Sequence, residues 1–226
     1  MAEELGKIEK PEVESFKGLR KLYLVPLLFA GEDAPSEYTE RFNRYWEQIG
    51  EHIDKQESKV GRIKRVYHEQ ITVSGDEGLK VMEKLSPSSC RIATEKCQNG
   101  AILEATELAE LTYECIDWER CLLMGFLSQK VAQMVSESYR EASKKRYEHI
   151  ASRIDETLQA NEVAVLFIRE GHMVQFPQDI EVFSVAPPTL DEIHRWLREW
   201  SSKETEGEPE DKTGEPGDKT SDSEGN

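Results

Sequence analysis

The sequence predicts an α/β protein, folded as a three-layer α/β/α sandwich or as two small α/β lobes, with a disordered acidic C-terminal tail. Three observations support this prediction. Two nearly continuous apolar runs, Lys21–Ala30 and Val163–Ile168, are typical of strands that are buried on both faces of a sheet. Between these runs, apolar residues recur three or four positions apart, which indicates amphipathic helices. Residues 201–226 contain no aliphatic or aromatic side chain, so they have no apolar surface to bury.

The first predicted elements are a strand and a helix. In the strand over Lys21–Ala30, Pro26 lacks a backbone donor and therefore favours a bulge or an edge position. Ser36 can cap the helix that follows. The apolar residues of this helix form one stripe, made of Tyr38, Phe42, Tyr45, Trp46, Ile49 and Ile53.

A second strand and a second helix follow in the same order. The segment Val60–Val73 alternates loosely and contains β-branched residues, which favours a strand. Ser74 and Glu77 form a capping box at the start of a short helix. The next segment, Ser86–Gly100, is weakly specified and could hold a short strand around Arg91–Thr94.

Two long helices are predicted in the middle of the chain. Ala101–Leu123 has apolar residues at helical spacing, with Cys115 on the stripe that should be buried. Gly125 should interrupt the chain before a second helix over about Ser128–Leu158. At 1.5 Å per residue that helix would be about 45 Å long, and its polar stretch Glu141–Lys145 favours a kink.

The chain closes with a strand–strand–helix unit. Val163–Ile168 and Ile180–Val185 are short apolar runs rich in β-branched and aromatic residues. Thr189 and Glu192 form a capping box at the start of the last helix.

These elements define the expected domain organisation. An α/β body should span residues 20–200; if it forms two lobes, they should divide near residues 86–100 or near residue 125. Residues 1–19 are charged and poor in apolar periodicity, so we expect a mobile N-terminal segment. Residues 201–226 form the expected disordered tail.

The composition limits the classes of partner. The 226 residues include 45 acidic and 29 basic side chains, which gives a formal net charge of -16. Binding to nucleic acid depends on Lys and Arg at phosphates, so this charge argues against general binding to DNA or RNA, and no DNA partner is expected. No apolar stretch reaches the roughly 18–20 residues needed to cross a bilayer, and the acidic start of the chain is unlike a secretory signal. We therefore expect a cytoplasmic protein with no membrane partner.

The sequence contains none of the motifs that mark common catalytic and cofactor sites. The patterns G-x-S-x-G, H-E-x-x-H, the P-loop and the dinucleotide-binding loop are all absent. No two histidines lie four residues apart, as many zinc sites on helices require. The cysteine spacing matches no zinc or redox motif, so free thiols are expected at Cys90, Cys97, Cys115 and Cys121. We predict no catalytic, cofactor-binding or metal-ligating residue and no cofactor.

One candidate interaction surface is the densest basic cluster of the chain. It lies on the predicted helix Ser128–Leu158 and comprises Arg140, Lys144, Lys145, Arg146 and Arg153. This face could bind RNA, a ribosome or an acidic protein. Acidic residues lie among the basic ones, however, and a solvated helix with ion pairs four residues apart explains the pattern better.

A second candidate is a polar site at the ends of predicted strands. His68 and Glu69 lie in the region where the second strand leads to the next helix, and Arg169 and His172 lie in the turn that joins predicted strands near their ends. Proteins of the α/β class often place binding groups in such loops. An ordinary turn in which Gly171 adopts a positive φ is the simpler interpretation.

The segment Ile154–Val185 resembles a known family. A helix ending DETLQANEV leads into the strand VAVLFI and, after a turn, into IEVFSV, which is similar to the third domain of the archaeal and eukaryotic class-one release factor and Pelota family. The resemblance covers about a seventh of the chain and implies an L30e-like sandwich that works as a protein-binding, ribosome-associated module. The Gly-Gly-Gln motif of the peptide-releasing members is absent here, so no release chemistry is implied.

The sequence thus favours a non-enzymatic protein-interaction module with an unidentified protein partner. An RNA- or ribosome-associated translation factor that uses the basic face is an alternative. Another is an enzyme whose site is assembled from scattered residues such as His68, Glu69, Arg169 and His172. An interaction module predicts an exposed apolar patch, whereas an enzyme predicts that these polar residues meet in a pocket.

Overall fold

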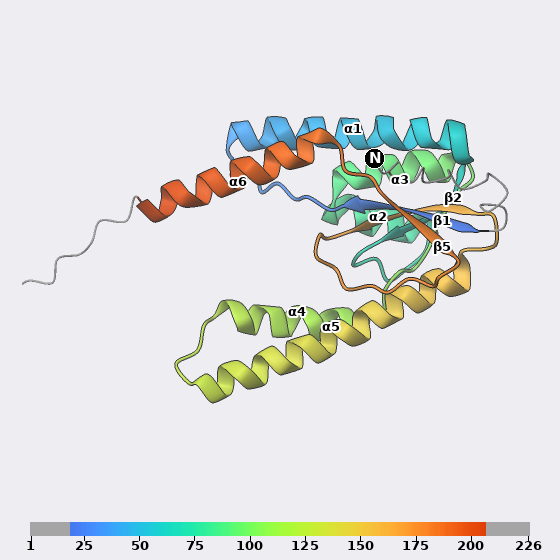
Figure 1. Cartoon of the computed structure of the whole chain (residues 1–226). Coiled ribbons are helices and arrows are strands. Elements are labelled where there is room, and N and C mark those ends of the chain that lie inside the picture. Colours follow the sequence, from blue (N-terminus) through green and yellow to red (C-terminus); the bar gives the residue numbers. More distant parts are fainter. Residues whose placement is uncertain (1–18, 207–226) are drawn as a thin grey trace, which may run out of the picture.

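The computed structural model describes residues 19–206, with side chains described as far as residue 202. Within that range, six helices surround a five-stranded parallel sheet with the strand order β3-β2-β4-β1-β5 (Figure 1). The α/β fold predicted from the sequence is therefore confirmed. The elements are β1 (Arg20–Pro26), α1 (Ser36–Val60), β2 (Ile63–His68), α2 (Gly75–Leu85), α3 (Pro87–Gln98), β3 (Ile102–Leu103), α4 (Ala109–Leu123), α5 (Gln129–Thr157), β4 (Val163–Ile168), β5 (Ile180–Ser184) and α6 (Pro188–Glu206).

The sheet is buried on both faces, as its apolar runs predict. Strand β4 lies between β1 and β2, and all six of its residues are buried. Successive side chains of a strand point to opposite faces. Val165 and Phe167 therefore join one apolar core, while Ala164 and Leu166 join a second one. Helices cover both cores, so the body is a three-layer α/β/α sandwich.

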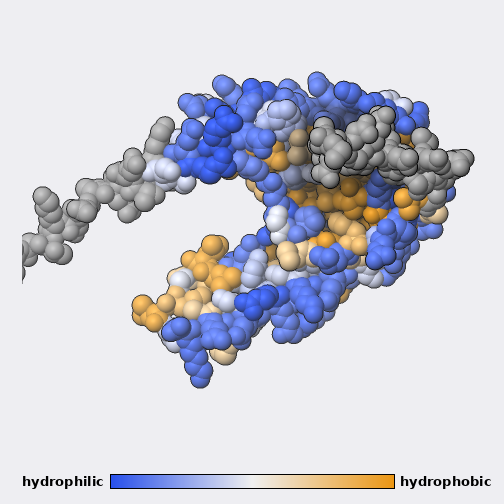
Figure 2. Space-filling model, in the orientation of Figure 1, coloured by the Kyte–Doolittle hydropathy of each residue, from blue (hydrophilic) through white to orange (hydrophobic). Residues whose placement is uncertain are grey.

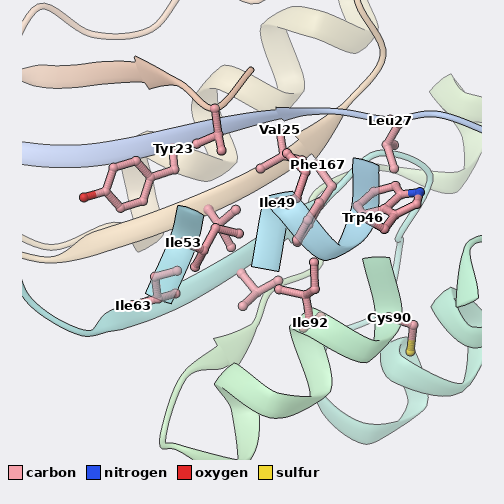
Figure 3. Packing of buried hydrophobic residues seen from close by; sticks show 14 of the residues in the cluster. Tyr23, Val25, Leu27, Trp46, Ile49, Ile53, Ile63, Cys90, Ile92 and Phe167 are labelled. Carbon is pink, nitrogen blue, oxygen red and sulfur yellow. The ribbon is translucent and has the colours of Figure 1, made fainter. Parts of the chain in front are cut away.

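The larger core lies between the sheet and helices α1, α2, α3 and α6. Trp46 and Ile49 of the predicted α1 stripe are buried there, and the ring centroids of Trp46 and Phe167 are 6.2 Å apart (Figure 3). The smaller core lies under α5, where Ile150 and Ile154 are fully buried. Burying one such side chain contributes roughly 1.5–3 kcal/mol, so these stripes hold α1 and α5 against the sheet.

Helices α4 and α5 form a hairpin that projects beyond the sheet (Figure 1). The 29 residues of α5 span about 44 Å at 1.5 Å per residue, and the helix is uninterrupted through Glu141–Lys145. Its first half packs on α4, where Cys115 Sγ lies 3.4 Å from Ser143 Oγ. Gly125 in the connecting turn has a φ of 70°, which agrees with the predicted break. The free end of the hairpin thus stands away from both cores.

The strand predicted around Arg91–Thr94 is wrong, because this segment lies in helix α3. Pro87 occupies the first turn of α3, a position where its missing N–H is not needed. Ile92 and Ala93 pack into the larger core. Helix α3 is therefore stabilised by its contacts with other elements, and these contacts cannot be predicted from its largely polar sequence.

The helix predicted from Ala101 to Leu123 begins only at Ala109. Ile102 and Leu103 form the short edge strand β3, which pairs in parallel with β2. The tertiary pairing with β2 thus overrides the helical spacing of these first residues.

Strand β1 is shorter than predicted and ends at Pro26 rather than at Ala30. It pairs in continuous register with both β4 and β5, so neither the predicted bulge nor the predicted edge position is present. Because Pro26 is its last residue, the missing N–H does not interrupt the ladder, which continues as Leu27 N–H donates to the Ile168 carbonyl at 2.9 Å.

The two capping boxes mark helix starts correctly, but neither forms the predicted contacts. Ser74 is the N-cap of α2 without a side-chain hydrogen bond to the helix. The Thr189 hydroxyl donates to Gln48 Oε1 at 2.7 Å, and Glu192 forms an ion pair with Arg44. These two contacts stabilise the packing of α6 against α1.

Helix α6 continues to Glu206, so residues 201–206 are helical where the sequence predicts the start of a tail. The remainder of the predicted tail, residues 207–226, and residues 1–18 of the predicted mobile segment lie outside the described residues. In the part of the chain that the structure describes, no helix is long and apolar enough to span a membrane.

Strands from both sides of the two candidate division points belong to the same sheet. β1 and β2 precede residues 86–100, while β4 and β5 follow residue 125, and β4 is paired with both β1 and β2. A division at either place would therefore separate strands that are hydrogen-bonded to each other.

Candidate functional site

The carboxyl ends of β2 and β4 bring three of the predicted polar residues together. Glu69 directly follows β2 and Arg169 directly follows β4, and these strands are parallel neighbours. The Arg169 backbone N–H donates to Glu69 Oε2 at 2.7 Å, and its guanidinium donates to the same carboxylate. The guanidinium also donates to Glu119 of α4 at 3.1 Å. His68 precedes Glu69, so His68, Glu69 and Arg169 meet at one edge of the sheet.

A buried ion-pair cluster of Glu69, Arg146 and Glu107, called the charge cluster below, lies at this edge. Arg146 of α5 donates to both carboxylate oxygens of Glu107 at 2.6 Å and to Glu69 Oε1 at 2.9 Å. The three side chains are at most 2% exposed. The Thr112 hydroxyl and the Gln70 backbone N–H also donate to Glu107, at 2.6 and 2.7 Å. The charge cluster therefore ties α5 to the loops after β2 and β3.

Within the charge cluster, the surroundings of Glu107 and Arg146 favour their ionised forms. Burial alone would raise the pKa of Glu107, but the hydrogen bonds and charge of Arg146 outweigh it, so this pKa lies below its ordinary value. Burial would likewise lower the pKa of Arg146, but the carboxylates of Glu107 and Glu69 raise it above its ordinary value. Arginine, hydroxyl and backbone donors thus occupy the carboxylate oxygens of Glu69 and Glu107.

His68 has a structural environment. Its Nδ1 contacts the carbonyl oxygen of Glu69, its Nε2 lies 3.1 Å from Ser89 Oγ, and its ring lies 5.9 Å from that of Phe167. Burial lowers the pKa of His68 to about 4, although the Glu69 carbonyl and charge oppose the shift. His68 is thus a neutral, buried side chain at pH 7, out of contact with solvent.

His172 lies in the loop after β4, at the same edge of the sheet. Its Nδ1 accepts from the Val174 backbone N–H at 3.3 Å, and its ring makes an edge contact with Phe176. Burial lowers its pKa, and the charge of Glu69 opposes this shift. Gly171 has a φ of 74°, which agrees with the turn predicted here. His172 therefore orders the loop rather than joining the charge cluster.

The predicted position of Arg146 on an exposed basic face is wrong, because Arg146 is buried in the charge cluster. A signal for its burial does exist in the sequence. Ala142, Arg146, Ile150 and Ile154 lie four residues apart, and all four are buried on one stripe of α5. An arginine within an apolar stripe indicates a buried acidic partner. No periodic pattern identifies that partner, Glu107.

The other four residues of the predicted basic face fall into two groups. Lys145 pairs with Glu141 at 2.8 Å, and Arg153 pairs with Glu156 at 2.8 Å. These pairs fit the solvated helix with short-range ion pairs that the sequence favours. Arg140 and Lys144 form the second group, since both line a cavity.

This cavity has a volume of about 870 Å³ and lies between α5 and the loop after β4. Its wall combines apolar and aromatic side chains with six polar or charged ones, which are Ser136, Arg140, Ser143, Lys144, Glu148 and Gln175. The side chains that define its character are Leu122, Tyr139, Arg140, Lys144, Tyr147 and Met173. Sequence reasoning missed the cavity because α5 and the loop are brought together only by the fold.

The free end of the α4–α5 hairpin carries a group of exposed apolar side chains, called the apolar tip below. Leu123, Met124 and Leu127 have exposed fractions of 83%, 84% and 110%. Figure 2 shows hydrophobic residues gathered at this end of the hairpin. The sequence signal for the tip is the apolar run CLLMGFL, which continues across the predicted break at Gly125.

Comparison of the chain with protein-family models, with curated proteins and with solved structures found no match. The resemblance to the release factor and Pelota family therefore stays a prediction. Among residues 19–206, no group of three or more His, Cys, Asp or Glu side chains is arranged to hold a metal ion. The four cysteines are free, in agreement with their spacing.

Proposed function

We propose that this protein is a cytoplasmic, non-enzymatic interaction module that uses the apolar tip to bind another protein. One observation carries the proposal: Leu123, Met124 and Leu127 are neighbouring, highly exposed apolar side chains at the end of a projecting helical hairpin. Scattered exposed apolar residues are normal on a protein surface, but contiguous ones are typical of interaction sites.

The size of the apolar tip limits the strength of the interaction. Complete burial of one Leu or Met side chain is worth roughly 1.5–3 kcal/mol, so the three together would supply roughly 5–9 kcal/mol. The loss of translational and rotational freedom on association costs a similar amount. The tip is therefore expected to act as an anchor in an apolar pocket of the partner, with further contacts from the sides of the hairpin.

The charge of the chain indicates the surroundings of that pocket. With a formal net charge of -16, the protein should associate faster with a basic surface than with an acidic one. The proposed partner is thus a protein with an apolar pocket and a basic rim.

The structure gives less support to the two alternative functions. Binding of RNA or a ribosome would use the basic face, but Arg146 is buried in the charge cluster, and Lys145 and Arg153 are paired with carboxylates. For an enzyme, the convergence of His68, Glu69 and Arg169 is favourable, but the carboxylate of Glu69 is occupied by arginine donors and His68 is buried.

The test is affinity capture of the full-length protein from its native cell extract at low salt. The double variant Leu123→Ser/Leu127→Ser removes most of the apolar tip, while Leu85→Ser makes the same chemical change at an exposed leucine of α2. We expect the wild-type protein and Leu85→Ser to recover a stoichiometric protein partner. The double variant should recover at least tenfold less of this partner.

Two outcomes would contradict the proposal. Equal recovery of the partner by all three proteins would show that the apolar tip is not the binding surface. Recovery of RNA that disappears as salt is raised, independent of the tip, would instead favour the translation-related alternative. Because the substituted leucines are exposed, unchanged thermal unfolding serves as the control for folding.

A further inference from the structure

We infer that the cavity between α5 and the loop after β4 binds a small amphipathic anion, meaning a molecule with an apolar or aromatic body and one acidic group. This inference goes beyond the proposed function, since it concerns a different surface and a different class of ligand.

The size and walls of the cavity suit the apolar body of such a ligand. Its volume of about 870 Å³ lies in the range of roughly 300–1,000 Å³ that is typical of small-molecule sites. Tyr139 and Tyr147 of α5, Leu122 of α4 and Met173 of the loop supply aromatic and apolar surface. The loop follows the carboxyl end of β4, the edge of a parallel sheet at which α/β proteins commonly bind ligands.

The positive charge on the cavity wall is available to a ligand. Arg140 is exposed, and within the described part of the chain it has neither an ion pair nor a side-chain hydrogen bond. Lys144, one helical turn away, has only a 3.8 Å contact with Glu148, and both of these side chains are mostly exposed. Exposed pairs of this kind contribute little, so Lys144 can turn to an anion.

The other three residues of the predicted basic face are already paired. Lys145, Arg146 and Arg153 each have a carboxylate partner within 2.9 Å. The unsatisfied positive charge of this cluster is therefore concentrated on the cavity wall. Glu148 also lines the cavity, so the three charged side chains carry a net charge of one, which matches a ligand with a single acidic group.

The contrast between Arg140 and the aromatic wall predicts the orientation of the ligand. The guanidinium can donate two parallel hydrogen bonds to a planar carboxylate or to two oxygens of a sulfonate or phosphate. Tyr139 and Tyr147 would then contact the apolar body. A small inorganic anion would bind Arg140 but leave most of the volume of about 870 Å³ unfilled, so a ligand with both an acidic group and an apolar body fits the cavity better.

The experiment uses the full-length protein and the fluorescent probe 1-anilinonaphthalene-8-sulfonate, which combines an aromatic body with one sulfonate. Its neutral counterpart, N-phenyl-1-naphthylamine, has a similar body without the charge. We expect the double variant Arg140→Gln/Lys144→Gln to bind the sulfonate at least about tenfold more weakly, because it loses the charge-assisted hydrogen bonds. Its affinity for the neutral probe should change less than about twofold.

Two variants serve as controls. Lys145→Gln removes a neighbouring positive charge that is paired with Glu141 away from the cavity lining, and it should bind both probes as the wild type does. Leu123→Ser/Leu127→Ser removes most of the apolar tip, an exposed apolar surface that could also attract the probe, and it should retain the sulfonate site.

Three results would overturn the inference. These are the absence of saturable sulfonate binding, equal affinity of wild type and Arg140→Gln/Lys144→Gln, and loss of binding in the tip variant. Since the protein partner is not part of this measurement, the result is independent of the proposed function. Far-UV circular dichroism and thermal unfolding check that each variant is folded.

Discussion

Replacing Arg146 by Met should destabilise the fold strongly, because it leaves buried carboxylates without a main partner. Arg146 makes hydrogen bonds of 2.6, 2.6 and 2.9 Å to Glu107 and Glu69, and all three side chains are almost fully buried. Breaking a buried ion pair by removing one partner costs about 3–5 kcal/mol. In the variant, Glu69 would still pair with Arg169, whereas Glu107 would keep only neutral hydrogen-bond donors. The loss of folding free energy should therefore come mainly from the unpaired charge of Glu107. Urea unfolding at pH 7 measures the change in the free energy of unfolding.

The size of this effect should depend on pH. In the wild type, the pKa of Glu107 in the fold lies below the ordinary value of 4.5. Its stabilising contribution is therefore present above that ordinary value and is lost as the pH falls through the folded pKa. In Arg146→Met, burial should raise the pKa of Glu107, so stability falls as the pH rises through the raised value. The difference between variant and wild type should be smaller at about pH 5 than at pH 7.

The neighbouring residue provides a matched control. Lys145 pairs with Glu141 on the exposed side of α5, and Lys145→Met should leave the free energy of unfolding unchanged. Adding Glu107→Gln to Arg146→Met should recover part of the lost stability, since it removes the buried charge. A loss of less than about 1 kcal/mol for Arg146→Met, equal at both pH values, would refute the reasoning about the charge cluster.

Two further predictions concern the packing of α2 and the burial of His68. Gly78→Ala should destabilise the fold by about 1–3 kcal/mol, because a Cβ at this position would lie 2.3 Å from the Val73 carbonyl oxygen. Gly50→Ala in α1 should stabilise the fold by about 0.5–1 kcal/mol, because a Cβ there would have no heavy atom within 4 Å. Urea unfolding compares the two, and stabilisation by both would argue against the close approach. The His68 ring should protonate near pH 4 in the fold and near 6.5 when unfolded, so its contribution to stability is present above pH 6.5 and lost as the pH falls toward 4. An NMR titration of the ring with a midpoint near 6.5 would contradict its burial.

The elements that could be predicted from the sequence are those with a local pattern. Val163–Ile168 is an apolar run, and the structure places it as the buried strand β4. Helix α3 could not be predicted because its buried face includes Ser89, Cys90 and Lys96. Lys96 is buried because its ammonium group pairs with Asp54 and, at 2.9 Å, with Glu57, both on α1. The buried face of α3 can therefore be identified only when the position of α1 beside it is known.

The candidate site was predictable to a similar extent. The general tendency of α/β proteins to place polar groups at strand ends pointed to the turn with Arg169, whereas the contact of Arg169 with Glu69 depends on the pairing of β2 with β4. The pairing of Arg146 with Glu107, 39 residues apart, depends on how α5 crosses the loop after β3. The apolar tip could be read as a run of apolar letters, but its exposure depends on the hairpin standing away from the sheet.

The most direct test of the proposed protein-binding role is site-specific photo-crosslinking in the native cell. A photoreactive phenylalanine analogue replaces Leu127 in the apolar tip, and in a control protein it replaces Glu51, an exposed residue of α1. One discrete protein adduct is expected from position 127, absent from position 51 and weakened by Leu123→Ser. The absence of a protein adduct at position 127, or the same adducts from both positions, would contradict binding through the tip.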